Sequence, residues 1–225
     1  TRLGDDDVQV FAHPGDTQPL ATLHFLRQQR EKAPGLPNLC LADFIAPHTA
    51  GAPTQDYIGA FAVTAGLGIE APIRSFEENH DDYQAILLKA LADRLAEALA
   101  ERMHERVRRE FWGYAANEQL SASALISEDY QGIRPAPGYP ACPEHSEKAA
   151  LWKLLEVESR TGIQLTESFA MYPAASVSGW YFSHPQAKYF GLGDIGKDQV
   201  ADYAQRKGIT TEEAEKWLAP VLNYA

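Results

Sequence analysis

One arginine in a proline-rich stretch has the clearest potential for chemistry in this sequence. Residues 130–148 read YQGIRPAPGYPACPEHSEK, so that four prolines and two glycines surround Arg134. Proline fixes φ and glycine permits positive φ, which means that the residue types dictate the path of this loop. A guanidinium can donate two parallel N–H groups to a carboxylate or phosphate. We therefore expect the loop to present Arg134 either to an anionic ligand or to an internal Asp or Glu.

Two further features could contact a ligand next to Arg134. Ala136 stands between Pro135 and Pro137, which lack N–H groups, so it offers a single amide and carbonyl at a defined place. Tyr189 and Phe190 fall in a predicted short strand, residues 188–193, whose alternation sends one ring to each face. One ring is expected in the core, and the other could stack on a heterocycle or place a phenol beside a ligand.

Other candidate motifs lack the context that their chemistry requires. Residues 191–196 match G-x-G-x-x-G, but too few residues follow to close a βαβ unit, so turn glycines explain them better. Cys142-x-x-His145 could be half of a zinc site, yet no second ligand pair accompanies it. The carboxylate pairs 81–82 and 212–213 are adjacent in sequence and do not face each other on a helix. We predict no catalytic residue and no metal site.

The elements that must position these residues predict an α+β fold. Residues 7–12 and 19–26 flank a turn and are expected to form a β-hairpin. Residues 39–46 and 57–64 are predicted to be strands, and Thr210 begins a capping box for a last helix. Strands at both ends with helices between them indicate a twisted antiparallel sheet packed with helices.

The longest predicted element is one central helix over about residues 77–111, which contain no glycine or proline. Apolar side chains recur every three to four residues, which predicts a stripe that packs on the sheet. Glu97 falls on the polar side of this helix, where a row of charges is usually solvated. The stripe consists of Ile86, Leu87, Leu91, Leu95, Leu99, Met103 and Val107.

The composition limits the classes of partner. The 225 residues are 45% hydrophobic and 23% charged, as in an ordinary globular protein. A net charge of −11 argues against sequence-independent binding of nucleic acid, which needs a basic surface. No apolar run is long enough to span a membrane. Two distant cysteines without a signal peptide predict free thiols in the cytoplasm.

The motif RPAPGYPACPEH closely resembles that of the reactivation domain of cobalamin-dependent methionine synthase. The family pattern is Arg-x-x-x-Gly, here Arg134 to Gly138, followed by Tyr139. The likeness continues through WGYAANEQL, LTESFAMYPAASVSGWYFSHP and KWLAPVLNY, and it covers nearly the whole chain. The resemblance implies that residues 1–225 are a single domain, most of such an activation domain without its N-terminal part. The first residue, threonine rather than methionine, agrees with an excised piece.

The resemblance also implies a ligand and the residues that bind it. The family's domain binds S-adenosylmethionine. Its arginine, the alanine two residues later, an acidic residue on the long helix and a tyrosine–aromatic pair contact the nucleoside. The corresponding set, with the rest of the motif, is Arg134, Ala136, Gly138, Tyr139, Glu97, Tyr189 and Phe190. Phe190 stands where the family often has tyrosine.

The implied reaction is reductive methylation of cob(II)alamin to methylcobalamin. The resemblance implies that cobalamin is bound by a partner domain of the same enzyme and that the enzyme's zinc lies in another module. It also implies that a flavodoxin-like protein donates the electron. The chain would then supply binding and orientation rather than acid–base chemistry. Two alternatives stay open: a free-standing S-adenosylmethionine-dependent methyltransferase, and a non-catalytic nucleoside-binding or docking module.

Overall fold

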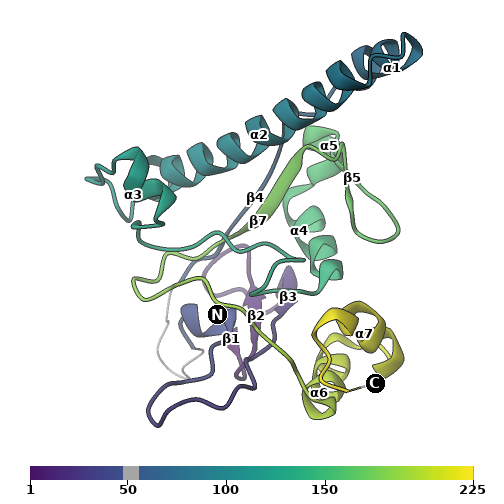
Figure 1. The fold of residues 1–225 in the computed structure, drawn as a ribbon. Coiled ribbons are helices and arrows are strands. Elements are labelled where there is room, and N and C mark those ends of the chain that lie inside the picture. Colours follow the sequence, from purple (N-terminus) through teal and green to yellow (C-terminus); the bar gives the residue numbers. More distant parts are fainter. Residues whose placement is uncertain (48–55, 225) are drawn as a thin grey trace. The chain divides into compact units, whose positions relative to one another are not determined.

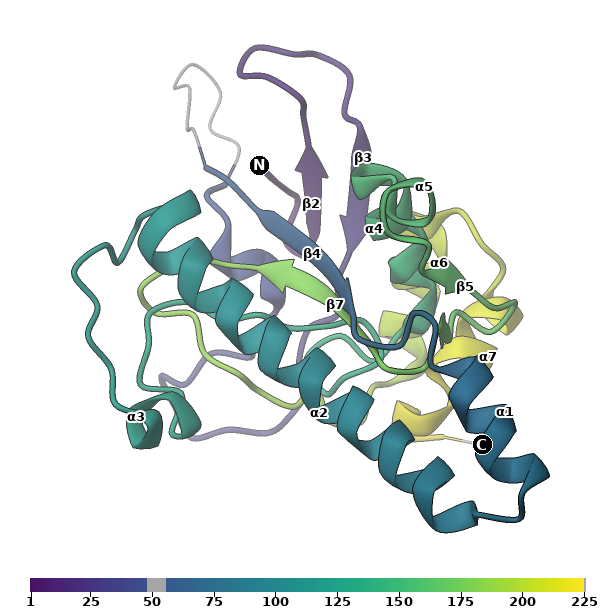
Figure 2. The same cartoon turned by 90° about the horizontal axis from the view of Figure 1, so that it is seen from above.

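A computed structural model describes residues 1–47 and 56–224 of the chain (Figures 1 and 2). It has helices and small antiparallel sheets, which confirms the α+β prediction. Contacts divide the chain into two compact units, each built from separate stretches of sequence. The first contains Thr1–Gly59, Gln131–Ala150 and Trp180–Ala225, and the second contains Ala60–Tyr130 and Leu151–Gly179. None of the described helices is long and apolar enough to cross a membrane.

The first unit begins with a small antiparallel sheet in the order β1 (Arg2–Leu3), β2 (Asp7–Val10) and β3 (Ala21–His24). Asp7 lies opposite His24, and the pairing of β2 with β3 confirms the predicted hairpin. Val8 and Leu23 are paired and almost fully buried, so the apolar positions of the alternating pattern face the core.

The same unit ends in the helix pair α6 (Lys197–Lys207) and α7 (Thr211–Leu218). Thr210 accepts a hydrogen bond from the Glu213 amide at 3.1 Å, so the predicted cap begins α7. The apolar faces of the two helices pack together with residues from earlier in the chain into one buried core. Its members are Leu26, Leu192, Ile195, Val200, Tyr203, Ala204, Ala214 and Leu218.

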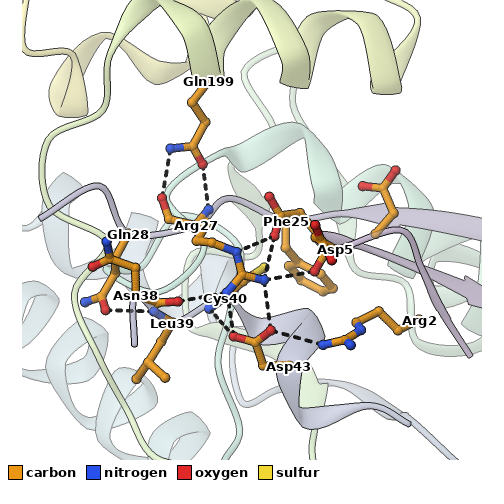
Figure 3. A network of polar contacts seen from close by, with 12 residues as sticks. Arg2, Asp5, Phe25, Arg27, Gln28, Asn38, Leu39, Cys40, Asp43 and Gln199 are labelled. Carbon is orange, nitrogen blue, oxygen red and sulfur yellow. Dashed lines mark hydrogen bonds and ion pairs between the residues drawn. The ribbon is translucent and has the colours of Figure 1, made fainter. Parts of the chain in front are cut away.

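Arg27 connects distant parts of the first unit (Figure 3). Its guanidinium donates to both carboxylate oxygens of Asp43, each at 2.8 Å, and to Asp6 at 2.8 Å. The Arg27 backbone pairs with the Gln199 side chain of α6: the amide donates at 2.6 Å and the carbonyl accepts at 2.8 Å. These two bonds span 172 residues of sequence.

The strand predicted over residues 39–46 is wrong, because residues Leu41–Phe44 form a 3₁₀ helix. Asp43 is the reason. Its carboxylate accepts the Cys40 amide at 2.9 Å while its own amide donates to the Cys40 carbonyl at 3.1 Å. These local bonds compete with a strand ladder. Cys40, Leu41 and Ala42 are nonetheless fully buried, as the apolar run indicated.

The predicted strand over residues 57–64 is confirmed as β4 (Gly59–Thr64), which forms a two-stranded sheet with β7 (Ser176–Tyr181). The boundary between the two units passes through both strands. A second pair consists of β5 (Gln164–Leu165) and β6 (Met171–Tyr172). Three short helices are α3 (Ala122–Ile126), α4 (Lys148–Leu155) and α5 (Val157–Thr161).

The central helix is not continuous over residues 77–111. A first helix, α1 (Glu70–Glu78), ends before His80, which has a φ of 56°. α2 (Asp82–Arg106) then starts at Asp81, whose carboxylate accepts the Gln84 amide at 3.1 Å. α2 continues into a π-helical turn over Val107–Phe111. The lack of glycine and proline therefore predicted one continuous helix, whereas the N-capping residue Asp81 marks the start of a second helix.

The leucine stripe of α2 does not form its buried face, contrary to the prediction. Ile86, Leu87, Leu91, Leu95 and Leu99 are between 37% and 65% exposed. Four of the buried side chains directly follow a residue of the apolar stripe in sequence, so the buried row lies about 100° around the helix from that stripe. The buried side chains of α2 share one further property. They are mostly small, which allows a neighbouring backbone to approach closely, and they are Ala85, Ala92, Ala96, Ala100 and His104.

Candidate functional site

The Arg134 loop is held by backbone pairing with the end of β7. Ile133 and Phe182 exchange two N–H···O bonds of 3.0 Å each, and the Pro135 carbonyl accepts the Trp180 amide at 2.9 Å. The Ile133 side chain is 2% exposed, whereas Arg134 is half-buried. Because adjacent side chains in an extended segment point to opposite faces, anchoring Ile133 in the core turns Arg134 the other way.

A tight turn follows Arg134. The Tyr139 amide donates to the Ala136 carbonyl at 3.1 Å, and the Gly138 amide donates to the Cys142 carbonyl at 2.7 Å. The Cys142 amide in turn donates a hydrogen bond of 2.9 Å to the Tyr139 carbonyl. Gly138 has a φ of 95°, which only glycine adopts without strain. The turn leaves the Tyr139 side chain 59% exposed.

A second segment, residues 189–192, lies against this loop. The Arg134 amide donates to the Tyr189 hydroxyl at 3.0 Å, and the Leu192 amide donates to the Pro140 carbonyl at 2.8 Å. The segment is not the predicted strand. Its backbone is instead bound by loops and side chains, since the Gly191 carbonyl accepts from the Gln28 amide group at 2.7 Å.

The first unit thus brings together most of the predicted site residues from two segments. Arg134, Ala136 and Gly138 are half-buried, as are Tyr189 and Phe190, while Tyr139 is exposed. Glu97 belongs to the second unit, where it is an exposed residue of α2. Its placement beside Arg134 stays a prediction.

A buried charged cluster, which the sequence did not reveal, lies after the turn. Lys207 of α6 donates to Glu144 at 2.5 Å, to Glu147 at 2.6 Å and to Ser146 at 2.7 Å, and Tyr203 donates to Glu144 at 2.9 Å. Both carboxylates are at most 3% exposed. Burial opposes the ionised carboxylate, but the Lys207 ammonium prevails and lowers the pKa of Glu144.

The Cys142–His145 pair has a structural environment rather than that of a ligand pair. Burial raises the pKa of the Cys142 thiol well above its usual range, and the carboxylates of Glu147 and Glu144 add to the shift. His145 Nδ1 lies 2.7 Å from Lys148 Nζ. Among residues 1–47 and 56–224, no group of His, Cys, Asp and Glu side chains could hold a metal ion.

Two comparisons relate this chain to known proteins. The sequence model of the family described as "Vitamin B12 dependent methionine synthase, activation domain" matches residues 1–208. A crystal structure of the MetH reactivation domain bound to AdoHcy has a TM-score of 0.93 and 60% sequence identity to this chain. The match covers 98% of this chain and 67% of that one.

Proposed function

Because this chain belongs to the family of vitamin B12-dependent methionine synthase activation domains, we propose that it binds S-adenosylmethionine at the Arg134 loop. The proposed role is reactivation: the bound molecule supplies a methyl group to the cobalamin of another domain of the same enzyme. The observation that carries the proposal is the joining of two segments, 134–140 and 189–192, by the Arg134–Tyr189 and Pro140–Leu192 hydrogen bonds.

The chemistry of the ligand supports this assignment. The half-buried Arg134 guanidinium suits the carboxylate of the methionine moiety, which it can bind with two parallel hydrogen bonds. The backbone of Ala136 suits the edge of the adenine ring. Phe190 has no hydroxyl group, so its contribution is stacking or packing against the nucleoside. We assign the cationic part of the ligand to the carboxylate of Glu97.

Cobalamin bound to its own domain would supply the nucleophile for the methyl group of S-adenosylmethionine, with S-adenosylhomocysteine as the leaving group. The chain's residues bind and orient the donor. A flavodoxin-like protein is proposed as the donor of the electron that the reductive methylation of cob(II)alamin requires.

Calorimetric titration of the chain with S-adenosylmethionine and with S-adenosylhomocysteine tests the binding site. We expect saturable binding of both at one site per chain. Titration with methylthioadenosine, which lacks the amino-acid carboxylate, is the matched control and is expected to bind more weakly. Equal affinity for all three ligands would contradict the role given to Arg134.

Methyl transfer is tested by mixing the chain with a cobalamin-bearing domain, methyl-labelled S-adenosylmethionine and a one-electron reductant. We expect label on cobalt only when both proteins are present. Replacing a chemical reductant with reduced flavodoxin tests the electron donor. Equally fast labelling of another acceptor without cobalamin would favour a free-standing methyltransferase. Binding without transfer, even when the two domains are covalently linked, would favour a docking module.

Glu97→Gln separates a cationic contact from a structural one. If Glu97 faces the sulfonium, the variant weakens S-adenosylmethionine binding more than S-adenosylhomocysteine binding, because only the former carries that charge. Asp93→Asn, one turn earlier on α2 and also exposed, is the matched control. Unchanged affinity for both ligands would remove Glu97 from the site.

A further inference from the structure

The imidazole of His145 occupies the space beside Gly138 where a side chain would lie. A Cβ atom built on Gly138 would meet three atoms of the ring, at 2.8 Å from Nδ1, 2.9 Å from Nε2 and closer still to Cε1. The ring therefore fills the space that a side chain at position 138 would need. The Gly138 and Tyr139 amides both belong to the tight turn, so the ring packs directly against that turn.

Lys148 fixes the orientation of the ring. Its Nζ lies 2.7 Å from His145 Nδ1, and Lys148 is 5% exposed. An ammonium group can only donate, so Nδ1 must accept and the ring proton is on Nε2. The contact thus requires a neutral imidazole while Lys148 carries its proton.

The charges around His145 disfavour a second proton on this pair. The charged groups that face the ring are Lys148 and Glu144. The Glu144 carboxylate is already bound by Lys207, Ser146 and Tyr203, so it is poorly placed to neutralise a further cation. Burial, followed by the Lys148 ammonium, lowers the pKa of His145, and burial lowers that of Lys148.

We propose that His145 is a positioning residue that supports the Gly138–Tyr139 turn through its neutral ring, and that protonation of the His145–Lys148 pair weakens ligand binding at acidic pH. A second cation 2.7 Å from the first would repel the ring from Lys148 and so disturb its packing beside Gly138. The ligand-dependent part of this inference rests on the proposed function. Arg134 is anchored separately, through Ile133 and Tyr189, so the effect is concentrated on residues 136–139.

The first test needs no ligand. NMR spectra of the chain recorded between pH 5 and 8 follow the His145 ring and the Gly138 amide. We expect both to titrate together with a midpoint below 6.5, the ordinary value for histidine. In His145→Gln, which offers Lys148 an acceptor but does not titrate, the Gly138 amide should stay constant. A Gly138 amide signal that does not change while the His145 ring titrates would overturn the proposal.

The second test measures affinity for S-adenosylhomocysteine over the same pH range. The wild-type dissociation constant should be flat near pH 7.5 and rise below the midpoint by up to about tenfold per pH unit, the limit for one linked proton. His145→Gln should bind within about threefold of wild type at pH 7.5 and lose the pH dependence. Lys148→Met removes the opposing cation and should also give a flat profile.

The outcomes separate the two proposals. A wild-type chain that binds no S-adenosylhomocysteine at any pH refutes the proposed function, while the NMR titration still decides whether His145 positions the turn. A wild-type pH profile retained in both variants, with unchanged affinity, overturns the positioning role. A loss of affinity in His145→Ala with no recovery in His145→Gln would assign the ring a packing role alone and would also contradict the proposal.

Discussion

At the scale of single residues, the backbone of Arg134 is fixed on both sides by groups far away in sequence. Ile133 pairs with Phe182, and the Arg134 amide donates to Tyr189, 55 residues later. The loop therefore has its shape before a ligand arrives. Preorganisation of this kind reduces the entropy that binding would otherwise lose.

Arg134→Ala tests this arrangement. Losing a charge-assisted contact to the ligand carboxylate should cost about 2–3 kcal/mol, or about 30- to 150-fold in affinity. Calorimetry with S-adenosylmethionine measures the loss, and thermal unfolding should stay close to wild type. Arg134→Lys is the matched variant, and it should recover part of the affinity because it keeps the charge without the fork. Normal binding with lowered stability would instead identify a structural ion pair.

Gly138→Ala separates ring contact from backbone strain. Gly138 and Gly35 have φ values of 95° and 88°, but a Cβ on Gly35 meets nothing within 4 Å. Gly35→Ala should therefore cost about 1–2 kcal/mol for the left-handed backbone alone. Gly138→Ala should cost more, because the His145 ring must also move, and it alone should weaken binding. Denaturant unfolding and calorimetry provide the two measurements; equal effects of the two substitutions would contradict the ring contact.

The residue types of the candidate site were proposed from sequence, but the contacts between its two segments could not be predicted. A proline-rich loop with one arginine already indicated Arg134 and Ala136. The hydrogen bond between the Tyr189 hydroxyl and the Arg134 amide depends on how two loops pack against each other, and no local sequence pattern predicts that packing. Lys207 was missed for the same reason, because its partners lie 60 and 63 residues earlier in the chain.

At the scale of elements, α2 shows where a periodic pattern misleads. The leucine row and the alanine row repeat with the same spacing, so periodicity alone cannot decide which row is buried. The sequence prediction assigned the larger apolar residues to the buried face, whereas in the structure the alanines and His104 are buried. Small side chains allow close packing, and that preference appears only when the neighbouring elements are known.

Paired substitutions on α2 test which row is buried. Leu95 is 62% exposed, so Leu95→Lys should change the free energy of unfolding by no more than about 0.5 kcal/mol. Ala96 is 1% exposed, so Ala96→Leu should destabilise by about 1–3 kcal/mol through overpacking. Urea unfolding of both variants measures the difference. The reverse order would mean that the leucine row is the packed face.

At the scale of the whole molecule, the charged cluster of Glu144, Glu147 and Lys207 joins the central loop to α6 in the first unit. Lys207→Met leaves two buried carboxylates without their cation and should cost about 3–5 kcal/mol. Lys153→Met, at an exposed position of α4, is the control and should cost little. Thermal unfolding near neutral pH measures both; a similar small loss in each would show that the cluster contributes little.

The cluster also sets a direction for acid sensitivity. The pKa of Glu144 is lowered in the folded chain, so its contribution to stability is present above the ordinary value of 4.5 and is lost as the pH falls through the folded value. In Lys207→Met the same carboxylate loses its cation, its pKa rises, and the loss of stability begins at higher pH. Melting temperatures between pH 3 and 7 test this shift.

The pairing of Arg27 with Gln199 has a consequence for the time course of synthesis. The amide and carbonyl of Arg27 find these partners only after 172 further residues have been added. At about 5–20 residues per second, a ribosome needs on the order of ten to thirty seconds to make that stretch. During this interval the first unit cannot complete its contacts, and Val8 and Leu23 of the amino-terminal hairpin, which are buried in the folded chain, lack part of their core.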